Sequence, residues 1–362
     1  MPQGRSDRID IALLAAVAAH PQDLTSFVAS QLGVSRQTTA AHARALVKLG
    51  LLARSGTTRP TYLLGPNRFG EFAYALDGLA EDRVWSRDVA PLLSNLPGNV
   101  IDIAHYGLTE MVNNAIDHSE GKKLSVTVLS KDGRSTLRVT DDGIGIFRKI
   151  ASALDLPDDR LALLELSKGK FTTDPKRHTG EGVFFTSRVF DHFEIAAGGL
   201  VFDHMAGHDL DVLHEDKPEH VKPGTTIIMS IATDSARTLK QVFEEYSSGP
   251  DDYNFAKTIV PVRLAQVGDE NLISRSQAKR LMQRVDQFRH VVLDFAGVAT
   301  IGPAFADEIF RVFAREHPEV ELAAIRAVPE VQQMIRRAEV ARDQQKGDVP
   351  NTGSDGAVAR RP

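Results

Sequence analysis

The chain has 362 residues, of which 42% are hydrophobic and 25% charged, and a formal net charge of −5. It contains no cysteine, which excludes a disulfide scaffold, a thiol nucleophile and cysteine-ligated zinc. No apolar run approaches the ~20 residues of a membrane span, and no signal peptide opens the chain, so we expect a cytoplasmic protein without membrane contact. The length predicts two or three domains.

Residues 1–65 predict three helices followed by a hairpin. Gly33 ends the second helix, and Ser35 is a natural N-cap for the third. The expected elements are helices over Arg8–Ala19, Leu24–Leu32 and Ser35–Leu49, then strands over Leu51–Arg54 and Thr61–Leu64. This order resembles the winged helix-turn-helix family, which implies DNA as a partner.

The charge of this region agrees with that resemblance. Ser35 to Leu64 holds five basic residues and no acidic one. In a winged helix-turn-helix, the start of the third helix contacts base edges, while basic side chains further along and in the wing contact phosphates. The expected DNA-binding residues are therefore Arg36, Gln37, Thr38, Thr39, His42, Arg44 and Arg59, with Lys48 and Arg54 as further phosphate contacts. The alternative is a winged helix that mediates only protein contacts.

Residues 66–97 are predicted to be a helical linker. Phe69, Phe72, Leu76 and Leu79 recur at helical spacing, and the segment carries the only tryptophan, Trp85. About thirty residues are too few for the long two-helix hairpin that carries the phosphoacceptor in a sensor histidine kinase, which disfavours that class.

The central feature is a predicted helix over Val100–Ser119. Its apolar residues form one stripe, while Glu110, Asn114 and Asp117 share another face at i, i+4 and i+7. Two carboxylates and an amide stacked in this way suit a hydrated Mg²⁺ and a water beside a phosphate. A solvated helix face is the alternative. His105 and His118 on the same helix are more simply explained as packed or solvated residues than as phosphoacceptors.

Three further motifs follow this helix in order. Strands over Leu124–Leu129 and Thr136–Thr140 lead into Asp141-Asp142-Gly143-Ile144-Gly145, then Gly180-Glu181-Gly182 opens an apolar helix, and a strand begins at Pro223-Gly224-Thr225. Together they resemble the GHKL ATPase superfamily, which includes DNA gyrase B, MutL-type repair ATPases, heat-shock chaperones, histidine kinases and anti-sigma-factor kinases. The resemblance spans roughly Asp88 to Thr233 and predicts an ATP-binding domain over residues 98–234, an α/β sandwich.

By that resemblance, Glu110 orients or deprotonates the attacking water and Asn114 coordinates Mg²⁺. Asp141 accepts a hydrogen bond from the adenine amino group, with support from Thr225. The remaining nucleotide-binding residues are Asp117, Gly143, Gly145, Gly180 and Gly182. Glycines permit close backbone approach to a nucleotide, and the helix after Gly182 offers free N–H groups to a triphosphate.

Ile146 to Thr179 is expected to form the lid over the nucleotide. It contains Lys168, Lys170, Lys176, Arg177 and His178. Phosphoryl transfer depends on positioning and charge neutralisation, and Lys170 is our choice for a contact to the γ-phosphate. Lid lysines that serve only solubility are the alternative.

Residues 250–340 alternate strands and helices, which indicates a small α/β domain. Strands are expected over Thr258–Leu264, His290–Phe295 and Val320–Ile325; helices are expected over Ser274–Phe288, Pro303–Arg315 and Pro329–Ala338. The stretch from Leu293 to Arg311 resembles the STAS-like domains catalogued as DUF4325, which implies a protein partner. STAS antagonists carry a phosphorylatable serine in the loop after this strand. Here the loop is Gly302-Pro303-Ala304-Phe305, and the nearest hydroxyl is Thr300.

Two segments lie outside these domains. Ser235–Asn254 is expected to be a polar helix between the two domains, and residues 341–362 a disordered tail that begins near Glu339. The fold class is therefore α/β and multidomain: winged helix-turn-helix, GHKL domain, STAS-like domain.

Two functions compete at this point. In the first, a regulator binds Mg²⁺ and ATP, hydrolyses ATP slowly, and uses nucleotide binding to control the winged helix and the STAS-like domain. In the second, the chain is a protein kinase that acts on a partner. A nucleotide sensor without hydrolysis is a third possibility, disfavoured by Glu110. A homodimer is plausible, because winged-helix regulators commonly bind paired half-sites.

Overall fold

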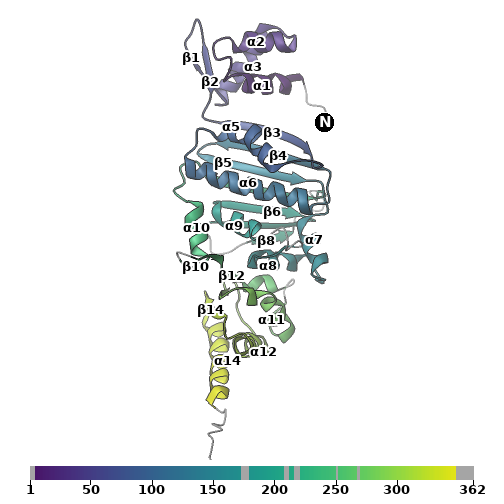
Figure 1. Cartoon of the computed structure of the whole chain (residues 1–362), viewed down its shortest axis with the longest axis vertical. Coiled ribbons are helices and arrows are strands. Elements are labelled where there is room, and N and C mark those ends of the chain that lie inside the picture. Colours follow the sequence, from purple (N-terminus) through teal and green to yellow (C-terminus); the bar gives the residue numbers. More distant parts are fainter. Residues whose placement is uncertain are drawn as a thin grey trace, which may run out of the picture. The chain divides into compact units, whose positions relative to one another are not determined.

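The computed structural model describes residues 5–172, 179–207, 212–215, 221–249, 252–266 and 270–347. The chain divides into two compact units (Figure 1). The first comprises Met1–Asp159 and Lys170–Phe243, and the second comprises Arg160–Gly169 and Glu244–Pro362.

The first unit begins with three helices and a hairpin. Ser35 caps the third helix through a 3.1 Å hydrogen bond from the N–H of Thr38 to its hydroxyl oxygen, and Gly33 ends the second helix at φ 63°. The elements are α1 (Arg5–Ala16), α2 (Leu24–Leu32), α3 (Arg36–Lys48), β1 (Leu52–Ser55) and β2 (Thr61–Leu64). Their core contains Leu13, Val28, Ala43, Leu46 and Tyr62. The arrangement is compatible with a winged helix-turn-helix.

A seven-stranded sheet forms the main body of the first unit. Its order is β3-β4-β5-β9-β6-β7-β8, and every neighbouring pair is antiparallel. The strands are β3 (Arg68–Ala75), β4 (Lys123–Lys131), β5 (Arg134–Asp141), β6 (His192–Ala197), β7 (Leu200–Met205), β8 (Val212–Glu215) and β9 (Thr225–Ala232). Asp132 and Gly133, both at positive φ, connect β4 to β5 in a tight turn of the kind that an Asp-Gly pair favours.

One long helix, α6 (Gly98–His118), lies along the strands of this sheet (Figure 1). Its buried stripe includes Ile103, Leu108 and Val112. Gly107 allows close packing, because a Cβ there would lie 2.4 Å from the Phe190 ring and 3.1 Å from Met229 Sδ. The other helical segments are α4 (Glu81–Arg83), the π-helical η1 (Val84–Val89), α5 (Ala90–Leu93), α7 (Ile146–Ala153), α9 (Gly182–Val189) and α10 (Leu239–Glu245).

The predicted helical linker is wrong in its first part. Arg68–Ala75 is not a helix but the edge strand β3, which pairs with β4 from Arg68↔Ser130 to Ala75↔Lys123. Phe69 and Phe72 are three residues apart, a spacing that suits a helix and places them on opposite faces of a strand, where Phe69 is exposed and Phe72 half-buried. The free hydrogen-bonding edge of β4 nevertheless favours the strand. Only the part from Glu81 to Leu93 is helical.

The second unit is built on a parallel three-stranded sheet of order β12-β13-β14. The predicted strands and helices are present, but the strand expected over Thr258–Leu264 ends at Pro261, and the helix expected over Ser274–Phe288 ends at Met282. Ser274 caps α11 in a capping box with Gln277. The strands are β12 (Lys257–Pro261), β13 (His290–Asp294) and β14 (Glu321–Ile325). The helical elements are η3 (Val262–Ala265), α11 (Arg275–Met282), η4 (Val285–Gln287), α12 (Pro303–Asp307), η5 (Glu308–Phe313), α13 (Ala314–Glu316) and α14 (Pro329–Gly347).

Two predictions near the ends of this unit need correction. The polar helix expected over Ser235–Asn254 is only the short α10, and β10 (Ser247–Gly249) pairs with β11 (Asp252–Phe255) after it. Helix α14 continues to Gly347, so the disordered tail is wrong up to that residue. The extension consists largely of Ala, Arg, Gln and Lys, which are good helix formers. Residues 348–362 lie outside the described part of the chain.

Helix α8 (Arg160–Lys168) belongs to the second unit, although the sequence predicts this segment as part of the lid. Leu161 through Lys168 are all buried. The Lys168 ammonium lies 2.7 Å from Glu165 and donates to the carbonyl of Gln283 at 2.8 Å, while Arg284 lies 2.9 Å from the other Glu165 oxygen. The Thr258 hydroxyl of β12 donates to the Lys168 carbonyl at 2.8 Å. The helix is therefore a core element of the C-terminal unit.

Within the described residues, no helix has the length and apolar character needed to cross a membrane.

Candidate functional site

The candidate site starts from the polar face of α6. Glu110, Asn114 and Asp117 lie on successive turns, as predicted; Glu110 and Asn114 are half-buried, and Asp117 is exposed. Among the described residues, the Asn114 amide makes only a long contact of 4.0 Å to Met111 Sδ. The carbonyl oxygen of Asn114 is of the type that Mg²⁺ accepts as a ligand.

Glu110 lies directly against the first residue of α9. A Cβ on Gly182 would be 2.0 Å from Glu110 Oε2 and 3.0 Å from Cδ, so any larger residue would displace the carboxylate. The backbone N–H groups in the first turn of a helix have no intrahelical partner and attract anions. The structure therefore places the predicted catalytic carboxylate beside a turn suited to phosphate.

Tyr106 is an electrostatic neighbour of this carboxylate and of Glu181, and Glu181 is in turn a neighbour of Lys170. Burial lowers the pKa of Lys170, against the effect of nearby Glu181. Burial likewise raises the pKa of Glu181, which Lys170 partly offsets. The pKa of Tyr106 is raised by burial and by the negative charges of Glu110 and Glu181. The fold thus brings Lys170 to the same region as Glu110.

Glu181 and Tyr106 were not predicted as site residues. Glu181 stands between the two glycines of the predicted phosphate-binding motif, and Tyr106 precedes Glu110 by one helical turn; these positions are the signals that could have found them. Lys168 is engaged in the second unit, as described above. Lys176, Arg177 and His178 lie outside the described residues.

Asp141 occupies a second, tightly packed part of the site. It is 7% exposed, and its Oδ1 accepts hydrogen bonds from the N–H of Gly143 at 2.8 Å and of Thr225 at 3.2 Å. The Thr225 hydroxyl accepts from the N–H of Ile146 at 3.0 Å. Burial raises the pKa of Asp141, opposed by these two N–H groups. The remaining carboxylate oxygen is a fixed acceptor.

Glycines make this packing possible. A Cβ on Gly143 would lie 2.0 Å from the carbonyl oxygen of Ser119, at the end of α6. A Cβ on Gly224 would lie 2.0 Å from the carbonyl of Asp141. Gly145 and Gly180 have φ of 87° and 73°, a region that favours glycine. The backbone therefore reaches Asp141 from both neighbouring segments.

Comparison with known families matches two parts of the chain. Residues 92–234 match the family model of histidine kinase-, DNA gyrase B-, and HSP90-like ATPases. This segment is a GHKL domain. Residues 277–332 match the STAS-like domain of unknown function (DUF4325). No curated protein matches the chain. The GHKL match covers Glu110, Asn114, Asp141, Gly182 and Thr225, and GHKL domains are ATP-binding domains.

The N-terminal residues predicted to contact DNA divide into two groups. Arg36, Gln37, Thr38, Arg44 and Arg59 are exposed. Thr39 is fully buried and donates its hydroxyl to the carbonyl of Thr25 at 2.9 Å, so its prediction as a DNA contact is wrong. The start of α3 is a run of four polar residues, from Arg36 to Thr39, so the sequence alone does not reveal which threonine hydroxyl faces the core.

Helix α3 has one side that packs against α1, where His42 lies, and one face that is exposed to solvent. The His42 Nδ1 lies 2.8 Å from Asp10 of α1, which holds the half-buried ring against that helix. Gln37, Ala41, Arg44, Ala45 and Lys48 are exposed at i, i+4, i+7, i+8 and i+11, and therefore share one face. This face combines small side chains with basic ones.

In the C-terminal unit, Asp294 at the end of β13 accepts hydrogen bonds from the Arg326 guanidinium and, at 3.1 Å, from the N–H of Ala296. Thr300 is exposed in the following loop. The segment Gly302-Pro303-Ala304 begins α12 and offers no hydroxyl.

Proposed function

We propose that this chain is a regulatory protein in which the GHKL domain binds Mg²⁺ and ATP and hydrolyses ATP slowly. The observation that carries the proposal is the contact between Glu110 and Gly182: it combines a carboxylate fit to act on water with a helix terminus fit to bind phosphate. The buried acceptor of Asp141 supplies the adenine contact.

The residues present fit a magnesium nucleotide. Asn114 would hold the ion through its amide oxygen, and Lys170 would neutralise charge on the terminal phosphate. When bound, Mg²⁺ neutralises charge that develops on the phosphate oxygens. Glu110 would orient the attacking water and accept its proton. Glu181 would keep Lys170 positioned by its charge until a phosphate replaces it.

The position of α8 supports control of the C-terminal unit by the nucleotide. In the chain, α8 lies between α7 and α9, inside the segment that covers the nucleotide in GHKL proteins. In the fold, α8 is part of the second unit through its contacts to Thr258, Gln283 and Arg284. A nucleotide-dependent movement of the flanking segments must therefore pull on a core helix of the STAS-like unit. For a switch, ATP must bind differently to two arrangements of these segments, and we propose that the movement of the segments beside α8 supplies them.

DNA is the partner proposed for the N-terminal unit, through the exposed face of α3 and Arg59 in the hairpin loop. A protein is the partner proposed for the STAS-like unit. The proposed cellular location is the cytoplasm, and a homodimer would let two copies of α3 reach paired half-sites.

The decisive experiment is incubation of the purified full chain with γ-labelled ATP and Mg²⁺. Glu110→Gln is the test variant, and Asp102→Asn, an exposed carboxylate on the same helix, is the matched control. We expect free labelled phosphate from the wild type and the control, and little from Glu110→Gln with nucleotide binding retained.

The alternative outcomes are distinct. Label retained on this chain or on a protein from an added lysate would show a protein kinase in place of an ATPase. Nucleotide binding with neither product would show a sensor. Absence of nucleotide binding would overturn the proposal as a whole.

A further inference from the structure

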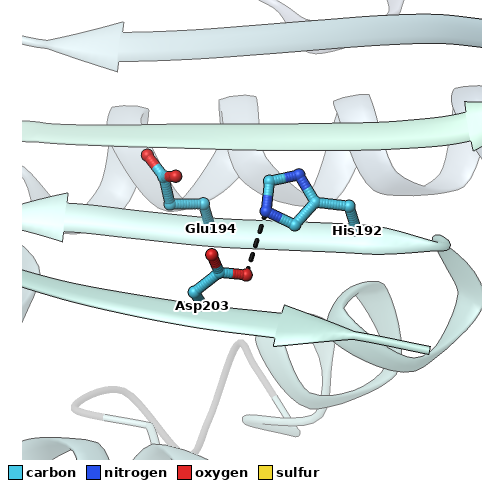
Figure 2. Close-up of side chains that lie close together, drawn as sticks. All are labelled: His192, Glu194 and Asp203. Atoms are coloured by element: carbon cyan, nitrogen blue, oxygen red, sulfur yellow. Dashed lines mark ion pairs between the residues drawn. The ribbon is translucent and has the colours of Figure 1, made fainter. Parts of the chain in front are cut away.

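The face of the seven-stranded sheet opposite α6 carries a group of half-buried titratable side chains. Met229 of β9 lies under α6, next to Gly107, and its strand partner Phe193 shares that face. His192 and Glu194 alternate with Phe193 along β6, so they lie on the opposite face. Asp203 of β7 pairs directly with Glu194 and joins them there (Figure 2).

These three residues form a compact set of potential metal ligands. One ligand atom from each lies within 4.8 Å of the other two. His192 Nε2 is 3.0 Å from Asp203 Oδ1 (Figure 2). Two ligands at i and i+2 on one strand and a third on the neighbouring strand is a geometry that a sheet supplies without strain, because all three side chains project from the same face.

The charges of the set are unbalanced. Glu194 and Asp203 stand directly opposite each other, and like charges in that position destabilise a strand pair. The side chain of Glu194 makes no hydrogen bond or ion pair with any residue that the structure describes. Asp203 Oδ1 is buried and accepts no well-directed hydrogen bond from the described residues, in spite of its proximity to His192. A cation bound between the carboxylates would resolve both defects.

The surface beside the set is hollow. A depression of about 450 Å³ is lined by Arg134, Asp191, His192, Met205, Ala206 and Ser230. His192 belongs both to this depression and to the ligand set. Water or a small anion therefore has room to complete the coordination of an ion bound by His192.

We propose that His192, Glu194 and Asp203 bind one Zn²⁺ ion. Imidazole nitrogen with two carboxylate oxygens is a donor set that zinc accepts at about 2.0–2.2 Å, with a fourth position left to solvent. Magnesium prefers oxygen ligands alone, so the imidazole selects against it. The side chain of Glu194, without a partner among the described residues, can rotate to close the remaining distance. The ion would link β6 to β7 on the face opposite α6 and is independent of the nucleotide.

The test is a zinc titration of the full chain, stripped with chelator and free of nucleotide, by calorimetry. We expect one strong site for Zn²⁺ and none for Mg²⁺ under these conditions. Asp203→Asn and His192→Gln should each weaken zinc binding by about 10–100-fold or more. Glu71→Gln, an exposed carboxylate on β3 of the same sheet, is the matched control and should bind zinc like the wild type.

A second readout guards against misfolded variants. In chelator, Glu194→Gln should melt at the same temperature as the wild type or higher, because it removes the carboxylate repulsion. With zinc added, the order should reverse, since only the wild type gains stability from the ion. Zinc binding that is unchanged in all three site variants, absence of a strong site, or a melting order that zinc does not reverse would each overturn the proposal.

Discussion

At the scale of single residues, the candidate site depends on carboxylate side chains that are partly or fully removed from solvent. Asp141 is buried in a carboxyl-binding nest of two N–H groups, and Glu110 rests on a position where only glycine fits. Both arrangements cost stability in the free protein, since a buried carboxylate is unfavourable and glycine disfavours a helix. Such costs are typical of residues retained for binding and chemistry.

Asp141→Asn should abolish adenine nucleotide binding without lowering the free energy of unfolding at pH 7. The amide oxygen can still accept from Gly143 and Thr225, but its NH₂ end repels the adenine amino group. Because the pKa of Asp141 is raised in the fold, the native state binds its proton more tightly than the unfolded chain. That contribution to stability is present below the unfolded pKa of about 3.9 and is lost as pH rises through the folded pKa.

The measurement is denaturant unfolding of both proteins from pH 4 to pH 7, together with nucleotide titration. The variant should gain stability relative to the wild type as pH rises through the raised pKa of Asp141. A variant that binds ATP normally, or one that is less stable than the wild type at pH 7 by several kcal/mol, would contradict the assignment.

Gly182→Ala should separate hydrolysis from binding. The added methyl group must displace the Glu110 carboxylate, and misplacement of a catalytic group by about 1 Å can reduce a rate roughly 100-fold. Alanine suits the helix itself. Phosphate release and nucleotide affinity are measured in parallel, with Gly98→Ala as the control, because a Cβ at Gly98 meets nothing within 4 Å. Equal hydrolysis rates in the two variants would show that Glu110 has no role in the reaction.

At the scale of elements, α8 is unusual because two of its charged residues, Glu165 and Lys168, are as buried as its leucines. Glu165 and Lys168 are 1% and 0% exposed. Burial lowers the pKa of Lys168 to about 8, opposed by the charge of Glu165. The carboxylate is therefore shared by two cations, the buried Lys168 and the half-buried Arg284, and holds α8 to the segment that follows α11.

Glu165→Gln should destabilise the C-terminal unit by about 3–5 kcal/mol, the usual cost of leaving a buried charge without its partner. Urea unfolding of the full chain, followed by a probe in the C-terminal unit, measures this loss. Glu330→Gln, at an exposed position of α14, is the control and should lie within about 0.5 kcal/mol of the wild type. A loss for Glu165→Gln as small as that of the control would show that the ion pairs do not secure α8.

At the scale of the whole molecule, the chain passes from the first unit into the second and back before it enters the second unit for good. The chain crosses from one unit to the other once before α8 and once after it, and these two crossings connect the predicted lid to the STAS-like unit. The covalent path is thus in place for the nucleotide to influence both units, and the N-terminal helices belong to the first.

A non-hydrolysable ATP analogue should alter hydrogen exchange in α8 and β12, which share the hydrogen bond between Thr258 and Lys168. The same analogue should change the affinity of the full chain for DNA. Both effects should be absent in Asp141→Asn, which serves as the control for nucleotide binding. Changes confined to the GHKL domain, with unchanged DNA affinity, would show an ATPase without the proposed switch.

Much of the local structure could be predicted from the sequence alone. The Ser35 cap, the Gly33 stop, the Asp132-Gly133 turn and the polar face of α6 depend on neighbours within a few residues, so sequence patterns reveal them. The matched GHKL segment contains the motifs that include Glu110, Asp141, Gly143 and Gly182. Each of these motifs is a short stretch of neighbouring residues, so it can be recognised in the sequence.

Only the tertiary structure decided which distant segments meet. Arg68–Ala75 is a strand because β4 offers a free hydrogen-bonding edge. Thr39 faces the core because its hydroxyl finds an acceptor in α2. Helix α8 belongs to the second unit because β12 and Gln283 satisfy its polar groups. Burial and charge pairing act between such segments, whereas a periodic pattern or a cap records only local geometry.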